Sequence, residues 1–266
     1  MEQVTLRFQE HSRTVFVREL TGNDERCVCD TSTRTLVDLL NRLLIWPPGV
    51  NKQADELTAS DRDLLLRVIY ARLYGKNVHS TALCTACTSR YDITFSLDDL
   101  ATEVGRSAQP SKAQSMPDGT FRTASGLRFR LPVARDEIEV SHLSGEEAAG
   151  ALVARCLLES PADTDLGPEQ SRSLLEGVME DIAPIFDLET DTHCPECGSH
   201  QSVRFDLQFY LLRAIEQDRV QMVREIHRIA SAYGWGFTEI LSLQRSERLR
   251  LVRLIDEDLG ARGRSA

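Results

Sequence analysis

The sequence predicts an α+β fold with strands near its N-terminus, two cysteine-bearing knuckles at its centre and a helical C-terminal region. Three observations predict this fold class. Two C-x-x-C pairs lie far apart in the chain. A strand pattern of alternating apolar residues follows each pair. Helical periodicity dominates the segments between the pairs and the segment after the second one.

Length and composition restrict the class of protein. The chain has 266 residues, 41% of them hydrophobic, and a formal net charge of -10. It is long enough for one large domain or two small ones, and the acidic balance disfavours a general binder of nucleic acid or anionic membranes. No apolar run approaches the roughly 20 residues of a membrane span, and the polar N-terminus lacks the pattern of a signal peptide. We therefore expect a cytoplasmic protein with reduced thiols, which favours metal binding over disulfides.

Residues 1–75 are expected to form an N-terminal strand–helix segment. Its elements, in order, are two strands within residues 3–20, a turn at 21–24, a helix at 33–46 and a helix from Thr58 or Ser60 to Gly75. Proline residues stop the first helix, and a glycine at the C-cap ends the second. This second helix leads the chain directly to the first cysteine pair.

The two cysteine pairs belong to an internal repeat. The stretches "LCTACTSRYDITFSL" and "HCPECGSHQSVRFDL" each contain a C-x-x-C turn followed by alternating apolar residues. A phenylalanine follows the second cysteine by eight positions in both, from Cys87 to Phe95 and from Cys197 to Phe205. Residues 76–97 are therefore the first knuckle and strand, and residues 185–207 the second.

This repeat predicts a split zinc ribbon, because two facing C-x-x-C turns can close a tetrahedral site around one structural Zn²⁺. Gly198 suits the tight turn after the second pair, whereas the first pair has Thr88 at that position. Four thiolates leave no open position for water, so the zinc is not expected to be catalytic. The expected metal ligands are Cys84, Cys87, Cys194 and Cys197.

Alternatives to zinc follow from the same residues. A redox role would require a helix after each cysteine pair, but strands follow instead. Iron in a rubredoxin-like site remains an alternative, since "CPECG" occurs in such sites too. Three nearby histidines could replace a cysteine or hydrogen-bond a sulfur, although surface positions are the simpler expectation: His79, His193 and His200.

The other cysteines are not expected to bind this metal. Cys27 and Cys29 are two positions apart, so a strand would direct them to opposite faces. Cys156 lies among apolar residues at helical spacing and is expected to be a buried core thiol.

Residues 98–184 are interpreted as an inserted hairpin and helical module. Its elements are a polar linker at 104–119, a hairpin at 120–132 with Ser125–Gly126 at its turn, and helices at 145–159 and 169–182 separated by a loop. Residues 185–193 then form a strand that enters the second knuckle.

Residues 208–266 are expected to form a helical C-terminal region. A long helix ends at Gly234, and a short and a longer helix follow it. The apolar side of the long helix consists of Leu211, Ile215, Met222, Ile226 and Ile229.

The sequence offers no pattern of a catalytic site, so we expect a non-enzymatic protein without a small-molecule substrate. A zinc-pinned structural or assembly protein competes with a zinc-ribbon and helix-turn-helix DNA-binding regulator, in which Arg245, Arg248, Arg250 and Arg253 would meet DNA. The acidic run 256–258 argues against DNA. We therefore expect this region to bind protein, through Trp235, Phe237, Arg248 and Arg250. Packing of Trp235 at a corner between helices is the alternative.

Several of these stretches together resemble a known family. "LTGNDE", "LTASDRDLLLRVIYARLYG", the two knuckles and "EIHRIASAYGWGFTEILSL" are similar to baseplate-hub or baseplate-assembly proteins of contractile-tailed phages and phage-tail-like contractile injection systems. The resemblance covers most of the chain and is weak in the insert. It implies a non-enzymatic part of a baseplate hub, or an assembly factor for it, that contacts other baseplate and tail-tube proteins. It implies no membrane, nucleic acid or small-molecule partner.

Overall fold

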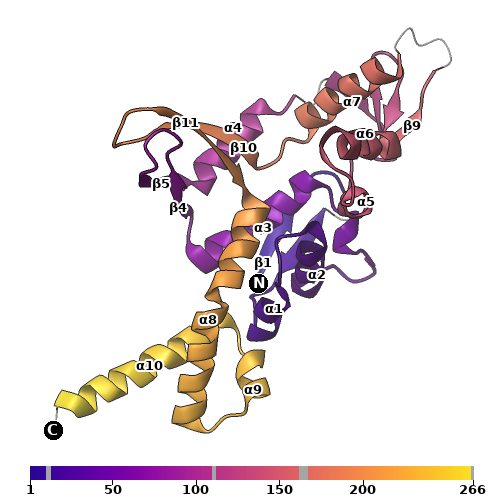
Figure 1. The fold of residues 1–266 in the computed structure, drawn as a ribbon. Helices are drawn as coiled ribbons and strands as arrows, with labels where there is room; N and C mark the ends of the chain where they lie inside the picture. The colour runs from indigo at the N-terminus through magenta and orange to yellow at the C-terminus, as the bar shows by residue number, and fades with distance from the viewer. Residues whose placement is uncertain (10–12, 110–111, 162–166, 265–266) are drawn as a thin grey trace. The chain divides into compact units, whose positions relative to one another are not determined.

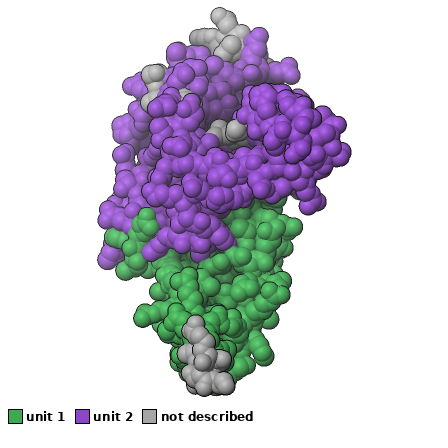
Figure 2. Space-filling model, turned by 90° about the vertical axis from the view of Figure 1, so that its left-hand side faces the viewer, with its two compact units in different colours: residues 1–2, 16–45, 209–266 green, residues 3–15, 46–208 purple. Residues whose placement is uncertain are grey.

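The computed structural model describes residues 1–9, 13–109, 112–161 and 167–264, and shows a mixed α/β protein with several small antiparallel sheets (Figure 1). The chain divides into two compact units (Figure 2). Unit 1 comprises residues 1–2, 16–45 and 209–266, and unit 2 comprises residues 3–15 and 46–208. Among the described residues, no helix has both the length and the apolar character needed to cross a membrane.

Unit 1 combines segments from the N-terminal and C-terminal parts of the sequence. Its elements are α1 (Gly22–Cys27), α2 (Thr33–Leu43), β3 (Leu44–Ile45), most of α8 (Leu207–Tyr233), α9 (Phe237–Ser242) and α10 (Arg245–Arg264). The strands β1 (Glu2–Thr5) and β2 (Thr14–Val17) pair with β3 in the order β1-β2-β3. The unit boundary falls within β1 and β2.

The C-terminal helices pack around one apolar cluster. Met222, Ile226 and Ile229 of α8 meet Ile240 of α9 and Val252 of α10. The expected apolar side of the long helix is therefore confirmed at all three of these α8 positions. Gly234 ends α8 with a positive φ of 70°, and its amide donates to the Ala230 carbonyl at 2.8 Å, as expected for a glycine after a helix.

Arg248 of α10 is buried in unit 1, which corrects its assignment as a partner contact. Its side chain is 0% exposed and lies between two buried glutamates. Its Nη2 donates to Glu25 at 2.7 Å, and its Nε donates to Glu225 at 3.3 Å. A guanidinium enclosed in this way cannot touch another molecule. The apolar pattern of the surrounding helix gave no sign of these two carboxylates, because both lie far from Arg248 in the sequence.

Unit 2 contains the remaining elements. The helical ones are η1 (Ala54–Glu56), α3 (Ala59–Tyr74), α4 (Leu97–Ser107), α5 (Ala134–Val140), α6 (Gly145–Cys156) and α7 (Pro168–Ile182). A sheet of order β6-β7-β8-β9 consists of β6 (Ala113–Ser115), β7 (Phe121–Thr123), β8 (Arg128–Phe129) and β9 (Leu157–Glu159). Two separate hairpins complete the unit: β4 (Asn77–Leu83) with β5 (Arg90–Ser96), and β10 (Asp187–His193) with β11 (His200–Asp206).

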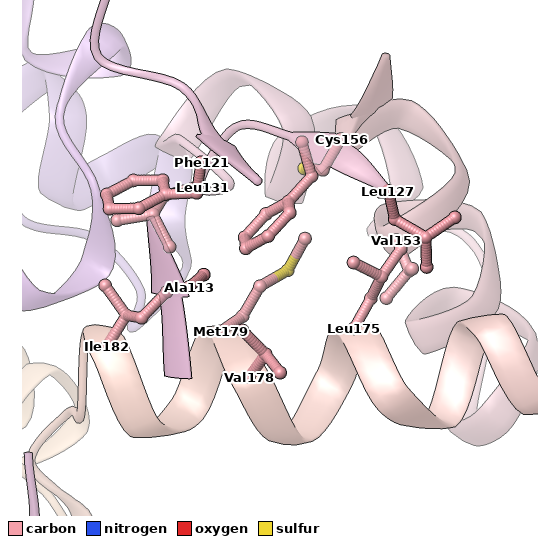
Figure 3. Close-up of a cluster of buried hydrophobic side chains, with 11 residues drawn as sticks. Ala113, Phe121, Leu127, Leu131, Val153, Cys156, Leu175, Val178, Met179 and Ile182 are labelled. Atoms are coloured by element: carbon pink, nitrogen blue, oxygen red, sulfur yellow. The ribbon is translucent and has the colours of Figure 1, made fainter. Parts of the chain in front are cut away.

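The small sheet of unit 2 and the helix α7 enclose one hydrophobic cluster (Figure 3). Met179 lies within it, and the rings of Phe121 and Phe129 stack with centroids 5.7 Å apart. Cys156 is 0% exposed there, which confirms that it is a core thiol. The predicted turn between β7 and β8 is also present, since Gly126 has a φ of 87°.

Three short helices differ from the sequence expectation. The expected turn at 21–24 opens α1, the segment 134–140 forms α5, and α4 occupies the first part of the expected polar linker. Asp24 and Asp136 explain the first two, because each carboxylate accepts the backbone amide three residues before it, at 2.9 and 3.0 Å. Such caps stabilise helices that are too short to show periodicity.

The ends of two longer helices show where local signals held and where they failed. Thr58 caps α3 by accepting the Asp61 amide at 3.2 Å, and Gly75 ends it with a φ of 88°, both as expected. The helix expected at 33–46 ends at Leu43, because Leu44 pairs with Val17 of β2 as a strand. A sheet partner distant in sequence therefore overrides helix propensity at this point.

A carboxylate on α3 holds the start of the second hairpin. The Phe186 amide, one residue before β10, donates to Asp63 at 2.7 Å. The Asp63 carboxyl is surrounded by protein, although the residue as a whole is only partly buried. Burial raises the pKa of Asp63 to about 7, against the Phe186 hydrogen bond and the Arg62 charge, which lower the pKa; Asp206 and Glu137 raise it further.

This raised pKa predicts a pH-dependent stability. The folded pKa lies above the unfolded value of 3.8, so the contribution of Asp63 is greatest below about pH 4 and is lost as the pH rises through about 7. Asp63→Asn should therefore raise the melting temperature at pH 8 and flatten its pH dependence between pH 4 and 7. Thermal melts of both proteins across that range measure this. Parallel curves would contradict the assignment.

Candidate metal centre

The two cysteine pairs lie at the turns of two hairpins of the same construction. Strand pairing runs from Asn77–Ser96 to Leu83–Arg90 in the first hairpin and from Asp187–Asp206 to His193–His200 in the second. The first cysteine of each turn donates its amide to a serine carbonyl, at 2.9 Å in one turn and 3.0 Å in the other. Each turn therefore presents two sulfurs from a rigid backbone loop.

The four sulfurs converge on one point in unit 2. Cys84 lies 3.6 Å from Cys197, and Cys87 lies 3.7 Å from Cys194, measured between Sγ atoms. All four Sγ atoms lie within 4.8 Å of one another. A tetrahedron with metal–sulfur bonds near 2.3 Å has edges of about 3.8 Å, which these contacts match. The four residues could thus bind one metal ion.

The two turns differ at one backbone position. Thr88 and Gly198 both have positive φ, 60° and 70° respectively, and each donates its amide to the carbonyl of the first cysteine of its turn. Glycine adopts this conformation without steric cost, whereas a β-branched residue does not. The turn geometry therefore holds in the first knuckle although its residue is unsuited to it.

Gln201 connects the two knuckles. It is 6% exposed, and its carbonyl oxygen accepts both the amide and the hydroxyl of Thr85, each at 3.0 Å. Its amide nitrogen donates to the Ser199 hydroxyl at 2.9 Å. That hydroxyl in turn lies 3.3 Å from the sulfur of Cys84 and 3.2 Å from that of Cys197. These contacts fix the relative placement of thiols from both turns.

Tyr91 occupies in the first hairpin the repeat position that Gln201 occupies in the second, seven residues after the first cysteine. It packs against the buried Cys84 and Cys194. Its hydroxyl is buried and has no hydrogen-bond partner among the described residues. A buried hydroxyl needs an acceptor, and a metal-bound thiolate is one. The cysteine sulfurs beside this hydroxyl therefore fit a metal site in which they carry negative charge.

Hydrogen bonds and burial act in opposite directions on the thiols. The Ser199 hydroxyl lowers the pKa of Cys84 to about 6 and also lowers that of Cys197. The pKa of Cys194 is raised to about 11, because burial and the adjacent Cys84 and Cys87 outweigh the hydrogen bond from the Cys197 amide. Four neighbouring thiolates repel one another, and a cation among them would remove that penalty.

The other residues considered for the metal site lie elsewhere or have other partners. His79 contacts the Thr94 hydroxyl at 3.1 Å, and His200 contacts Asp191 at 3.0 Å. His193 lies against the His200 ring, with centroids 5.5 Å apart. Cys27 is the last residue of α1 rather than part of a strand, and Cys29 is exposed after it.

Sequence analysis missed three residues of the site: Ser199, Gln201 and Tyr91. Ser199 has a repeat counterpart in Ser89, five residues after the first cysteine of each pair. That recurrence was the available signal. Nothing in the repeat distinguishes the serine that contacts sulfur from the one that does not, since this depends on which turn faces which.

In unit 1, the residues expected to bind a partner separate into exposed and buried ones. Trp235 is 42% and Phe237 is 54% exposed, and Arg250 is also exposed. Tyr233 lies beside Trp235, with ring centroids 5.5 Å apart. Arg248 alone is enclosed. We call Tyr233, Trp235 and Phe237 the aromatic patch of unit 1.

The geometry of the four thiols defines the class of this site as a candidate four-sulfur metal centre. No protein-family model matches the chain, and no curated protein or solved structure matches it. The class therefore rests on the distances and hydrogen bonds above. Four sulfurs accommodate zinc or iron, so the coordination geometry alone does not select the ion.

The strained turn of the first knuckle predicts a stabilising substitution. Thr88→Gly should raise the free energy of unfolding by about 1 kcal/mol, because the steric cost of positive φ exceeds the added flexibility of the unfolded chain. The converse change, Gly198→Ala, should lower it by a similar amount, since no atom lies within 4 Å of the added Cβ and only the backbone is strained. Denaturant melts of the two variants measure both. Destabilisation by Thr88→Gly would contradict the assigned turn conformation.

Proposed function

We propose that Cys84, Cys87, Cys194 and Cys197 bind one structural Zn²⁺ and that the two hairpins form a split zinc ribbon around it. The observation that carries this proposal is the convergence of four sulfurs from two distant segments. Cys84 and Cys197 are 113 residues apart in the sequence, and Cys87 and Cys194 are 107 residues apart. The sulfur–sulfur contacts suit a tetrahedral ion, and they are too long for disulfides. Zinc is favoured over iron because it is the usual ion of structural sites built from two C-x-x-C turns.

The ion would stabilise hairpins that have little core of their own. A two-stranded hairpin is marginally stable in water. Here the hairpins contact each other through Phe95 and Phe205, whose ring centroids lie 4.7 Å apart, and through the Gln201–Thr85 hydrogen bonds. Zinc supplies the cross-link between the four thiolates, the Ser199 hydroxyl contacts two of them, Gln201 holds Ser199, and Tyr91 packs against the site. All four coordination positions are then protein sulfurs, which suits a structural role rather than catalysis.

The proposed role of the protein is a non-enzymatic structural or assembly component of a phage-tail-like baseplate. Its partners would be other baseplate, hub and tail-tube proteins, in the cytoplasm where the particle is assembled. The resemblance in the knuckles and in "EIHRIASAYGW" supports this role. The aromatic patch supports it too, because exposed tryptophan and other aromatic residues are enriched in protein interfaces.

A DNA-binding regulator is less favoured by the geometry of unit 1. Arg248 is enclosed by glutamates, and Arg245 contacts Asp218 at 2.6 Å and Glu25 at 3.5 Å. Half of the four arginines proposed to contact DNA are thereby engaged within the protein. A recognition helix needs its cations free for phosphates and base edges.

Substitution of a ligand cysteine should remove the metal and destabilise the protein, whereas substitution of a cysteine outside the cluster should do neither. Cys194→Ser should abolish stoichiometric zinc, about one ion per chain in the unmodified protein, and lower the melting temperature strongly, because metal binding is coupled to folding of the hairpins. Cys29→Ser is the matched control, since Cys29 is exposed and outside the cluster. Elemental analysis and thermal melts measure both properties. Equal melting temperatures, or abundant iron with red colour, would contradict the structural zinc site.

The aromatic patch should be required for assembly and not for folding. Trp235→Ala combined with Arg250→Glu should abolish co-purification with baseplate and tail-tube proteins from particle-producing cells, while zinc content and melting temperature are retained. Phe209→Ala, at an exposed aromatic residue of α8 outside the aromatic patch, is the control and should retain co-purification. Mass spectrometry of the native complex identifies the partners. Recovery of DNA and RNA polymerase instead, lost on Arg250→Glu, would support the regulator.

A further inference from the structure

In unit 1, the turn before α10 binds the turn before α1 through a backbone bridge and an ion pair. Thr21 and Gln244 form an isolated antiparallel bridge. Arg248, four residues after Gln244, donates through Nη2 to Glu25 at 2.7 Å. The same guanidinium donates through Nη1 to the carbonyl of Leu243 at 3.3 Å. A backbone bridge and a buried ion pair thus join segments more than 200 residues apart.

Unit 2 contains the same contact between different segments. Thr58 and Val133 form an isolated antiparallel bridge. Arg62, four residues after Thr58, donates through Nη2 to the Glu137 carboxylate at 2.7 and 2.6 Å. Its Nη1 donates to the carbonyl of Leu57 at 3.3 Å. In both units the glutamate follows its bridged residue by four positions, so the bridge and the two arginine hydrogen bonds recur in the same register.

The acidic turns are built alike as well. Arg18 makes a two-point contact with Asp24 at 2.7 and 2.9 Å, and Arg130 makes one with Asp136 at 2.6 and 2.8 Å. The arginine amide donates to the carbonyl that ends the second helix after it, Leu43 of α2 or Cys156 of α6, at 3.0 Å in both cases. Both turns therefore have the pattern Arg-x5-Asp-Glu. The aspartate binds the arginine of its own turn, and the glutamate binds the arginine of the other segment, Arg248 or Arg62, which we call the docking arginine.

The order of elements extends this likeness over most of the chain. Among the described residues, β2, α1, α2, β3, α3, β4, β5 and α4 follow one another between residues 14 and 107, with η1 before α3. The elements β8, α5, α6, β9, α7, β10, β11 and α8 follow one another between residues 128 and 233. Hairpin pairing also closes alike, since Leu97 donates to the Lys76 carbonyl at 2.9 Å and Leu207 to that of Phe186 at 3.2 Å. We call these ranges module 1 and module 2.

We propose that the chain is a tandem duplication of one module, and that residues 243–248 are a docking element that caps the acidic turn of module 1. In unit 2, the acidic turn of module 2 receives its docking arginine from α3 of module 1. In unit 1, the acidic turn of module 1 receives its docking arginine from the start of α10, where "LQRSER" at 243–248 corresponds to "LTASDR" at 57–62. The partner that the element fits is an Arg-x5-Asp-Glu turn.

Close packing makes this cap specific. A Cβ on Gly22 would lie 2.8 Å from the Leu241 side chain and 3.1 Å from the Arg248 guanidinium, so the docking arginine packs closely against the first turn of α1. Glu25 is 1% exposed, and Glu225 supplies a second carboxylate to the same arginine. Removing Arg248 would leave Glu225 buried without its cation and Glu25 with only the longer contact to Arg245 at 3.5 Å, which is strongly unfavourable.

Hydrogen exchange of the full-length protein, read by mass spectrometry, tests the proposal. Arg248→Met should raise exchange of α1 and α10 by at least about tenfold and leave α3 and α5 unchanged. Arg62→Met should do the reverse. Arg250→Met, at an exposed position of the same helix as Arg248, should change neither pair. If a methionine variant fails to fold, Glu25→Gln and Glu137→Gln provide the same comparison with the side-chain size preserved.

The second test replaces residues of the docking element by their counterparts in residues 57–62. The double variant Gln244→Thr, Glu247→Asp gives residues 243–248 the sequence of residues 57–62 except at Arg245, which is kept because it contacts Glu25 and Asp218. Protection of α1 should persist in this variant and be lost when Arg248→Met is added to it. The proposal is overturned if the double variant loses as much protection as Arg248→Met. It is also overturned if Arg248→Met and Arg62→Met open the same helices. Neither readout depends on the proposed zinc ion.

Discussion

The closeness of four thiols is the constraint on which unit 2 depends. Two hairpins of two strands each, which would be marginal alone, meet at sulfur–sulfur contacts of 3.6 and 3.7 Å. The segment between the two knuckles, which runs from β5 through α4 and α7 to β10, begins and ends at this centre. Gln201 and Tyr91 take equivalent repeat positions yet act differently: one joins the knuckles by hydrogen bonds, and the other encloses the sulfurs. The centre therefore organises a segment much larger than itself.

In unit 1, a buried ion-pair cluster rather than a group of thiols joins distant segments. Arg248 neutralises two carboxylates in an interior where an unpaired ion would be strongly destabilising. Basic and acidic residues are equal in number in the residues of unit 1, so the net charge of -10 arises from unit 2. The absence of net charge on unit 1 supports the proposal that its exposed aromatic residues contact protein, because long-range repulsion does not oppose an approaching acidic partner.

Local signals in the sequence predicted much of the fold. The thiol spacing, the alternation after each pair, the Thr58 cap and the glycine ends of α3 and α8 all act within a few residues, and each is present. The misses have a common cause. The helix at 33–46 ends early because Leu44 pairs with β2, and α1 forms around a cap from Asp24. These outcomes depend on partners that periodicity does not reveal.

The sequence by itself determined which residues could serve as thiol ligands and where each knuckle turns, because both follow from spacing along a short backbone segment. Only the tertiary structure decided that Ser199 rather than Ser89 contacts the sulfurs, and that Arg248 is buried while Arg250 is exposed. The physical reason is that desolvation and hydrogen bonding are set by the segments that cover a residue. Those segments lie up to 223 positions away in the case of Arg248 and Glu25.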